Sequence, residues 1–216
     1  MPTTGPTATA SPLQTASQPP GVFNDEAYTV RRKVFKLFGA AFHLLDKSGN
    51  VIGYSKQKAF KLKEDIRVYK DESMQTELLT ILARQVIDWS ASYDVIDPRT
   101  GQPVGSLRRK GWKSNLVRDE WSIISPDGRE IGLVQEEGAF LAFLRRFVEF
   151  VSFLSPEKFN VLVGGVPVAQ FRQHFNPFVY KLSVAFTPNM SQYIDPRLVL
   201  AGSILIAAIE IGRAHV

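Results

Sequence analysis

The sequence contains no cysteine, and this absence excludes disulfide bonds, thiolate metal sites and cysteine nucleophiles. Lysine and arginine are missing from the first 26 positions, where Asp25 and Glu26 are the only charged side chains. An N-terminus without a basic start and a following apolar stretch does not have the pattern of a secretory signal. We therefore expect a cytoplasmic protein, and a peripheral location at the inner face of a membrane stays open.

Large apolar residues are also scarce at the start of the chain, which is rich in Pro, Thr, Ser and Ala. Such a composition cannot bury enough apolar surface to offset the entropy lost on ordering. It predicts a disordered leader over 1–26. The whole chain is 44% hydrophobic and 22% charged, which is ordinary for a globular protein. A single domain with one core is therefore expected over 27–210.

Motifs of the common enzyme classes are absent as well. The chain has no nucleophile elbow, phosphate-binding glycine loop, His-Glu-x-x-His zinc pair or dinucleotide fingerprint. His43 stands among apolar residues, where a packed and hydrogen-bonded histidine is expected. Four aspartates begin predicted turns, where a carboxylate bonds its own backbone; they are Asp46, Asp71, Asp97 and Asp127. The sequence therefore predicts no enzymatic activity and no cofactor or metal site.

From Tyr28 onward the chain consists of short alternating runs separated by turn signals. In FHLLDKSGNVIGYSKQ two such runs are joined across 46–50, and Gly49 is available for a positive φ. The same unit recurs at 93–109, 121–136 and 159–173, and a version without the glycine occupies 66–84. Regular short strands of this kind predict a sandwich or barrel built mostly from antiparallel hairpins.

One segment interrupts this pattern in the second half of the chain. In GAFLAFLRRFVEFVSFLSP the apolar residues fall at helical spacing on one broad face, and a proline ends the run. An additional amphipathic helix is predicted here. Its apolar face suits packing against the rest of the domain, which we favour, or insertion into a membrane interface. The candidate interface residues are Phe140, Phe143, Phe147 and Phe150.

The stretch from Leu198 to Ile209 carries no charge. Asp195 is a suitable N-cap for a helix that begins there, and Pro196 fits its first position. A membrane-spanning helix needs about twenty apolar residues, so twelve are too few. We therefore expect a buried core helix rather than a membrane anchor.

Basic residues are gathered into three short clusters in a chain of net charge +5. Such clusters favour anionic partners such as lipid headgroups or nucleic acid, and Lys is also typical of solvated strand faces that avoid edge pairing. Both interpretations stay open. Nucleic acid is disfavoured because aromatic and basic residues interleave only around Trp112. The candidate headgroup-binding residues are Arg31, Arg32, Lys33, Lys56, Lys58, Arg108, Arg109, Lys110 and Lys113.

The segment VRRKVFKLFGAAFHLLDKSGNVIGYSKQKAFKLKEDIRVYKDE resembles the opening of LURP-one-related proteins. The succession of hairpins is also similar to that of phospholipid scramblases, and both groups belong with the tubby C-terminal-like domains. The resemblance covers about residues 28–210. It implies a mainly β fold, in which about twelve antiparallel strands close into a barrel around a central apolar C-terminal helix.

The resemblance also implies association with membranes, since tubby domains bind phosphoinositide headgroups through basic side chains. Scramblases carry an acidic, calcium-loop-like segment before the last helix, whereas the corresponding stretch here holds only Asp195, so no calcium is expected. The predicted function is a non-enzymatic, membrane-associated, scramblase-related module that binds anionic phospholipid headgroups. The alternative is a structural or protein-interaction barrel without a lipid role.

The last seven residues, EIGRAHV, resemble the translation of a common sequencing-library adapter. We therefore expect 211–216 to be a non-native scar that lies outside the fold. On this interpretation the natural chain continues beyond Glu210 with a different sequence.

Overall fold

The structure is a computed structural model, and the chain is described at 27–35, 39–57, 65–85, 91–110, 120–136, 158–174 and 179–213. The predicted leader, 1–26, and the predicted amphipathic helix, 138–156, fall outside these ranges. Within them the strands are β1 Ala27–Phe35, β2 Gly39–Leu45, β3 Val51–Gln57, β4 Asp65–Tyr69, β5 Glu77–Gln85, β6 Ser92–Ile96, β7 Pro103–Arg109, β8 Glu120–Ile124, β9 Glu130–Glu136, β10 Lys158–Val163, β11 Val166–His174 and β12 Tyr180–Phe186.

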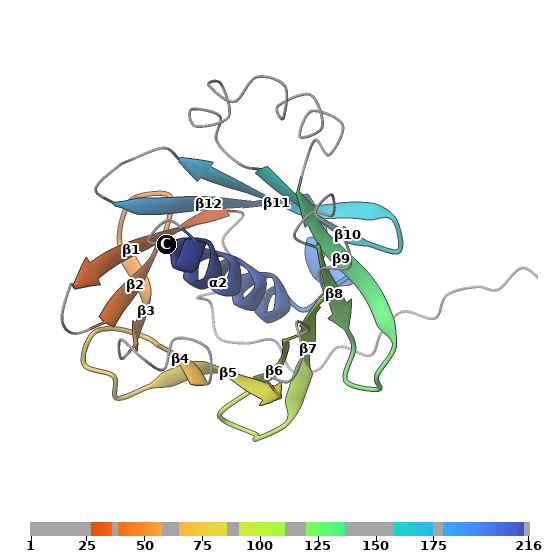
Figure 1. Ribbon diagram of the computed structural model, residues 1–216, viewed down its shortest axis with the longest axis horizontal. Coiled ribbons are helices and arrows are strands. Elements are labelled where there is room, and N and C mark those ends of the chain that lie inside the picture. The colour runs from red at the N-terminus through yellow and green to blue at the C-terminus, as the bar shows by residue number, and fades with distance from the viewer. Residues whose placement is uncertain are drawn as a thin grey trace, which may run out of the picture.

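The strands form one closed barrel in which each pairs antiparallel with the next along the chain (Figure 1). β1 closes the sheet on β12, with Val30 opposite Leu182 and Arg32 opposite Tyr180. Each of the described strands therefore has a paired neighbour on both sides, which reduces the aggregation hazard of an open sheet edge. The predicted closed barrel of antiparallel hairpins is confirmed.

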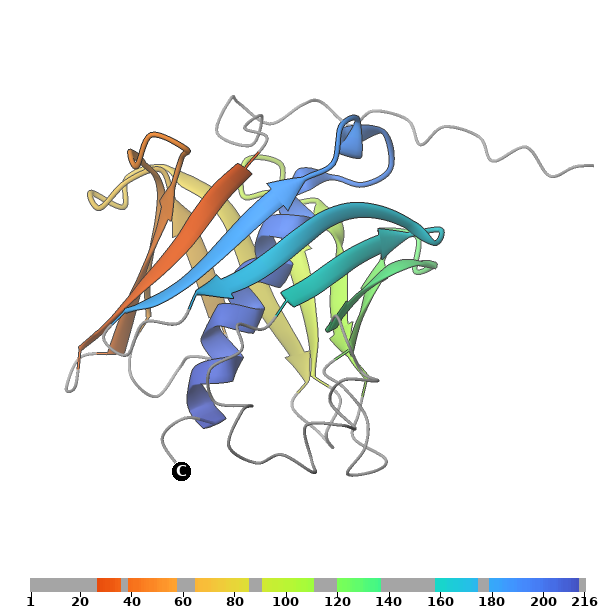
Figure 2. The ribbon, with the colours of Figure 1, turned by 90° about the horizontal axis from the view of Figure 1, so that it is seen from above.

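In this meander the connections between successive strands alternate between the two ends of the barrel. The hairpin end carries the turns at 46–50, 70–76, 97–102, 125–129 and 164–165. The far end, lower in Figure 2, is formed by the opposite ends of the same strands. Its residues are Phe35, Gly39, Gln57, Asp65, Gln85, Ser92, Arg109, Glu120, Glu136, Lys158, His174 and Tyr180.

Local turn chemistry forms the hairpin end. The carboxylate of Asp46 accepts hydrogen bonds from the backbone N–H and the side-chain amide of Asn50, both at 2.8 Å. Gly49 then adopts a φ of +86°, which is accessible to glycine at little cost. The carboxylate of Asp71 accepts a hydrogen bond from the backbone N–H of Ser73, two residues further on. Asp97 accepts one from the backbone N–H of Arg99 in the same way. The predicted structural role of the turn aspartates is confirmed for these positions.

A single α-helix of the described chain, α2 Pro196–Arg213, runs through the barrel from the hairpin end to the far end (Figures 1 and 2). Asp195 caps it by accepting a hydrogen bond from the N–H of Arg197 at 2.9 Å. Its residues from Leu198 to Ala208 are all buried, because strands surround the helix on every side. No helix among the described residues is long and apolar enough to cross a bilayer. The predicted core helix is confirmed.

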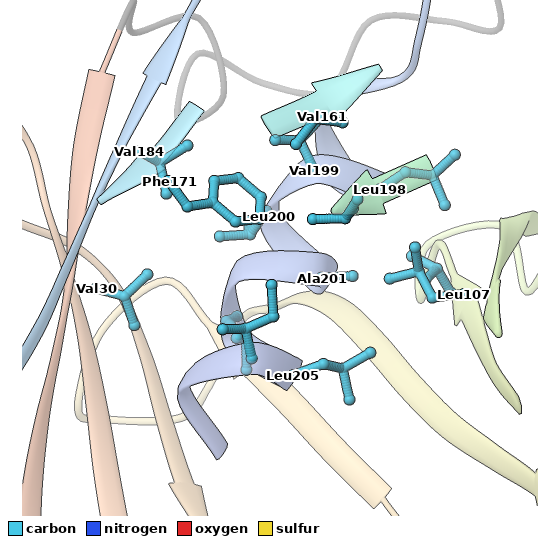
Figure 3. Close-up of a cluster of buried hydrophobic side chains, with 14 of the residues drawn as sticks. Val30, Leu107, Val161, Phe171, Val184, Leu198, Val199, Leu200, Ala201 and Leu205 are labelled. Atoms are coloured by element: carbon cyan, nitrogen blue, oxygen red, sulfur yellow. The ribbon is translucent and has the colours of Figure 1, made fainter. Parts of the chain in front are cut away.

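Inward-facing side chains of the strands fill the space around α2. Figure 3 shows Val30, Leu107 and Phe171 approaching Ala201 and Leu205 of the helix from different strands. Small residues on α2 permit this close packing. A buried polar contact also joins the middle of the helix to β1, where the hydroxyls of Tyr28 and Ser203 lie 3.2 Å apart. Fully buried side chains of large volume on the strands include Tyr93, Phe42, Phe159 and Ile66.

Candidate functional site

The barrel brings the three predicted basic clusters to the same end. Arg31 lies in β1, Lys56 in β3 and Arg108 in β7. These odd-numbered strands all run from the hairpin end to the far end, so their basic residues lie toward that end, on different sides of the barrel. Residues that are far apart in sequence therefore share one end of the molecule.

Strands β10, β11 and β12 add cations that the local sequence pattern did not indicate. Lys181 near the start of β12 lies directly opposite Arg31 in the register of β1. Lys158 begins β10, and Arg172 lies opposite it near the end of β11. Each is an isolated basic residue in its own strand. Their proximity to the predicted clusters depends on which strands pair and in what register, and the sequence pattern does not contain that information.

The predicted residues differ in how available their charges are. Lys56 and Arg108 are exposed and make no ion pair with any described residue. Lys110 is exposed too, but its ammonium lies 2.5 Å from Glu120 and 3.4 Å from Glu130. The hydrogen bond to Glu120 raises the pKa of Lys110. An anionic ligand would compete with these two carboxylates for Lys110, so Lys56 and Arg108 are the stronger candidates.

Arg32 and Arg109 lie on the inner face of the barrel wall, in contrast to the outward Arg31 and Arg108. In β1, Arg32 falls on the same face as the buried Tyr28 and Val30, and the residue is only 5% exposed. Its guanidinium lies over the ring of Phe42, 5.7 Å from the centroid. Burial lowers the pKa of Arg32 to about 10, so the side chain stays charged at neutral pH. Arg109 pairs with the buried Trp121 of the neighbouring strand β8, so its side chain also lies on the inner face of the wall.

The remaining predicted residues cannot be placed in this site. Lys33 lies in β1, where only its backbone is described. Lys58, Lys113 and the four phenylalanines of the predicted membrane interface, Phe140, Phe143, Phe147 and Phe150, lie outside the described residues. Their assignment to a headgroup site or a membrane interface stays a prediction.

Carboxylates gather at the hairpin end, opposite the basic far end. The turns there contain Asp46, Asp71, Glu72, Asp97 and Asp127. Several of these charges are engaged locally, as in the ion pair between Asp127 and Arg129 at 2.6 Å. The same turns also contain Lys47, Lys70, Arg99 and Arg129, so positive and negative charges nearly balance at the hairpin end.

A buried ionic network at the hairpin end has a structural role that the sequence did not reveal. Arg197, 4% exposed, donates to Asp97 at 2.7 Å and to Asp195 at 2.6 Å. Asp97 also accepts from Arg99, and these bonds lower its pKa to about 2, with the side-chain bond to Arg99 as the largest cause. The network joins the first turn of α2 to the connection between β6 and β7.

His43 lies on the outer face of β2, opposite Arg31 and Tyr54 in neighbouring strands. Its Nε2 is 2.7 Å from Glu72 and its ring packs against Tyr54 at 5.1 Å between centroids. The side chain is buried. The prediction of a packed, hydrogen-bonded histidine is confirmed.

A family model described as LURP-one-related matches residues 53–207, which include most of the barrel and most of α2. The chain belongs to the LURP-one-related family. The match confirms the resemblance seen in the opening hairpins, and the closed barrel around a C-terminal helix agrees with the tubby-like architecture expected for LURP-one-related proteins.

A solved X-ray structure of an Arabidopsis thaliana protein is similar to this chain, with a TM-score of 0.48 and 12% sequence identity. The similarity covers 85% of this chain and 91% of the Arabidopsis chain. No curated protein matches the sequence. The family assignment therefore depends on the family model.

Proposed function

We propose that the protein is a non-enzymatic module that associates with membranes containing anionic phospholipids, with the far end of the barrel toward the headgroups. The observation that carries the proposal is the placement of Arg31, Lys56 and Arg108 toward one end of the barrel, with Lys181 beside Arg31 and with Lys158 and Arg172 at the same end. The proposal includes the predicted relation to phospholipid scramblases, but it does not include the activity of moving lipids.

The expected strength of the interaction follows from the number of available cations. Each Lys or Arg near an anionic leaflet contributes about 1 kcal/mol, and the effect extends over roughly one Debye length. Removing two such charges should therefore weaken binding by about 2 kcal/mol, or roughly thirtyfold. Binding that depends on these charges should also fall when the salt concentration is raised.

The test is co-sedimentation of the full chain with vesicles of phosphatidylcholine alone or mixed with phosphatidylserine, at low and at high salt. The double variant Lys56→Gln/Arg108→Gln should lose about thirtyfold in affinity for the anionic vesicles. The matched control is Lys47→Gln/Lys70→Gln, which removes two exposed charges at the hairpin end. This control should bind like the wild-type chain.

Equal binding to neutral and anionic vesicles at low salt would overturn the proposal. In that case the alternative, a structural or protein-interaction barrel, becomes the better interpretation. If both double variants lost affinity equally, the interaction would depend on net charge alone and not on the far end. A duplex DNA arm in the same assay tests the disfavoured nucleic-acid partner.

A further inference from the structure

Three adjacent strands, β11, β12 and β1, carry polar side chains at six neighbouring positions of their outer face. The strands lie side by side in the barrel wall (Figure 2). The residues that alternate with these six positions are buried or partly buried on the inner face, so the six side chains lie outside. The members of this outer-wall grid are His174, Lys181 and Arg31 in one row and Arg172, Ser183 and Thr29 in the next.

The grid is compact enough for its side chains to reach a common ligand. Neighbouring strands lie about 4.8 Å apart, so three strands span about 10 Å. Residues directly opposite each other have Cβ atoms roughly 5 Å apart, and Lys181 has such a neighbour on both sides. The Nε2 of His174 lies 2.7 Å from the Oγ of Ser183, which links the two rows. The long side chains of the grid can therefore converge on one group.

The cations of the grid have no carboxylate partner. Arg31, Arg172 and Lys181 form no ion pair with any described residue. The Nε of Arg31 also has no hydrogen-bond partner. On the neighbouring strand β2 the carboxylate of Glu72 bonds to His43. Three close cations without a counter-ion repel one another, so an anion bound between them would be stabilised.

This arrangement contrasts with that of other exposed cations of the barrel, which are matched with acids from their own strand or a nearby one. The carboxylate neutralises the cation in each pair, so these positions offer little charge to a ligand. The pairs are Arg67 with Asp65, Arg84 with Asp94, Lys110 with Glu120 and Arg129 with Asp127.

We propose that the outer-wall grid binds a phosphate monoester and makes the protein select lipids whose headgroup is such a group. A phosphate monoester carries a charge of about −1.5 to −2 at pH 7 and three terminal acceptor oxygens. Guanidinium, ammonium and hydroxyl groups from three strands can donate to all three oxygens. The site deepens the proposed function and rests on it for the source of the phosphate. A soluble phosphate ester presents the same chemistry to the grid.

The test is co-sedimentation of the full chain with phosphatidylcholine vesicles that contain either phosphatidic acid or phosphatidylserine, adjusted to equal surface charge. The wild type should bind the phosphatidic acid vesicles about tenfold more tightly, as expected for one further charge-assisted hydrogen bond. Arg172→Gln/Lys181→Gln should lose this preference. The matched control is Lys56→Gln/Arg108→Gln, which removes two exposed cations outside the grid. It should weaken binding to both kinds of vesicle and retain the preference.

Equal affinity of the wild type for the two kinds of vesicle would overturn the proposal, and so would an undiminished preference in Arg172→Gln/Lys181→Gln. Both side chains are exposed, so this variant should have the Tm of the wild type. If it does not fold, Lys181→Gln alone replaces it and should reduce the preference roughly threefold. An unchanged preference in Lys181→Gln would then overturn the proposal.

A calorimetric titration with glycerol 3-phosphate, the soluble headgroup of phosphatidic acid, separates this proposal from the proposed function. Binding of glycerol 3-phosphate that is lost in Arg172→Gln/Lys181→Gln, without binding to anionic vesicles, would support the site and reject the membrane role. Equal binding to both anionic vesicles, with no binding of glycerol 3-phosphate, would reject the site and preserve the membrane role. Selective binding to phosphatidic acid vesicles that the grid variant loses supports both.

Discussion

At the scale of single residues, the face of the barrel wall on which a side chain lies decides its role. Arg31 and Arg32 are adjacent in the sequence, yet one lies on the outer face beside Lys181 and the other is buried against Phe42. Successive residues of a strand point to opposite sides of the sheet, so a run of basic residues is necessarily divided between solvent and core. A cluster in the sequence is therefore not a cluster on the surface.

Asp97 should be important for stability, because it joins the start of α2 to the barrel wall through Arg197. Asp97→Asn should lower the free energy of unfolding by about 2 kcal/mol, as expected for a hydrogen bond to a charged group. Urea denaturation measures the change. Asp46→Asn is the control, since Asp46 bonds only within an exposed turn, and its cost should be below about 1 kcal/mol.

The ionisation of Asp97 predicts that the stability of the folded protein depends on pH. The folded-state pKa of Asp97 is about 2, below the ordinary value near 4, so its ionised form stabilises the folded chain. This contribution is complete above about pH 4 and is lost as the pH falls toward 2. The difference in Tm between the wild type and Asp97→Asn should therefore shrink between about pH 4 and pH 2. A constant difference across this range would contradict the pKa assignment.

Met74 occupies the position that glycine holds in the other hairpins. It has a φ of +55°, in a region that costs a side-chain-bearing residue roughly 1 kcal/mol. Met74→Gly should therefore raise the free energy of unfolding by about 0.5 to 1 kcal/mol. Met74→Ala retains the Cβ and the strain, so it should be nearly neutral. Equal effects of the two variants in urea denaturation would show that backbone strain is not the cause.

At the scale of elements, strands and helix satisfy different packing requirements. β4 alternates buried and exposed residues, as expected for a sheet with one face in the core. α2 has no polar stripe over its described side chains, because strands surround it on all sides. The apolar character of the helix therefore results from its central position and does not require a membrane.

Substitution of two glycines by alanine tests how closely the strands and the helix pack. A Cβ on Gly202 of α2 would lie 3.9 Å from side-chain atoms of Leu107 and Phe171, which is an ordinary contact. Gly202→Ala should stabilise the protein by about 1 kcal/mol, because alanine favours the helix. A Cβ on Gly132 of β9 would lie 2.2 Å from the carbonyl oxygen of Leu162. Gly132→Ala should therefore lower the Tm, and thermal denaturation measures both variants.

At the scale of the whole molecule, the barrel and its helix depend on each other. The inner faces of the strands are lined by apolar side chains that contact α2, so an empty barrel would expose or collapse them. A chain that ends at Asp195 should lose cooperative unfolding and bind a hydrophobic dye.

A chain that ends at Glu210 is the matched control for this truncation. It retains every helix residue whose burial is described, so it should unfold cooperatively like the full chain. A cooperative transition in the shorter chain would show that the barrel folds without its central helix. Circular dichroism during heating distinguishes the two outcomes.

Much of this architecture could be predicted from the sequence, because the signals are local. Alternation of apolar residues predicted the strands, Asp46 and Gly49 predicted a turn, and Asp195 with Pro196 predicted the start of α2. The basic residues of the candidate site were also visible as short clusters. Their division between the two faces follows from strand alternation, but only once the strand and its buried face are known.

The sequence by itself determined which segments form strands, turns and the terminal helix, because these depend on side-chain period and backbone preference over a few residues. Only the tertiary structure decided that β1 closes on β12, that Lys181 lies beside Arg31, and that Asp97 meets Arg197 across 100 positions. Closure depends on the register of all twelve strands together. No local pattern contains that register, so the addition of Lys181, Lys158 and Arg172 to the predicted basic residues could be found only in the folded barrel.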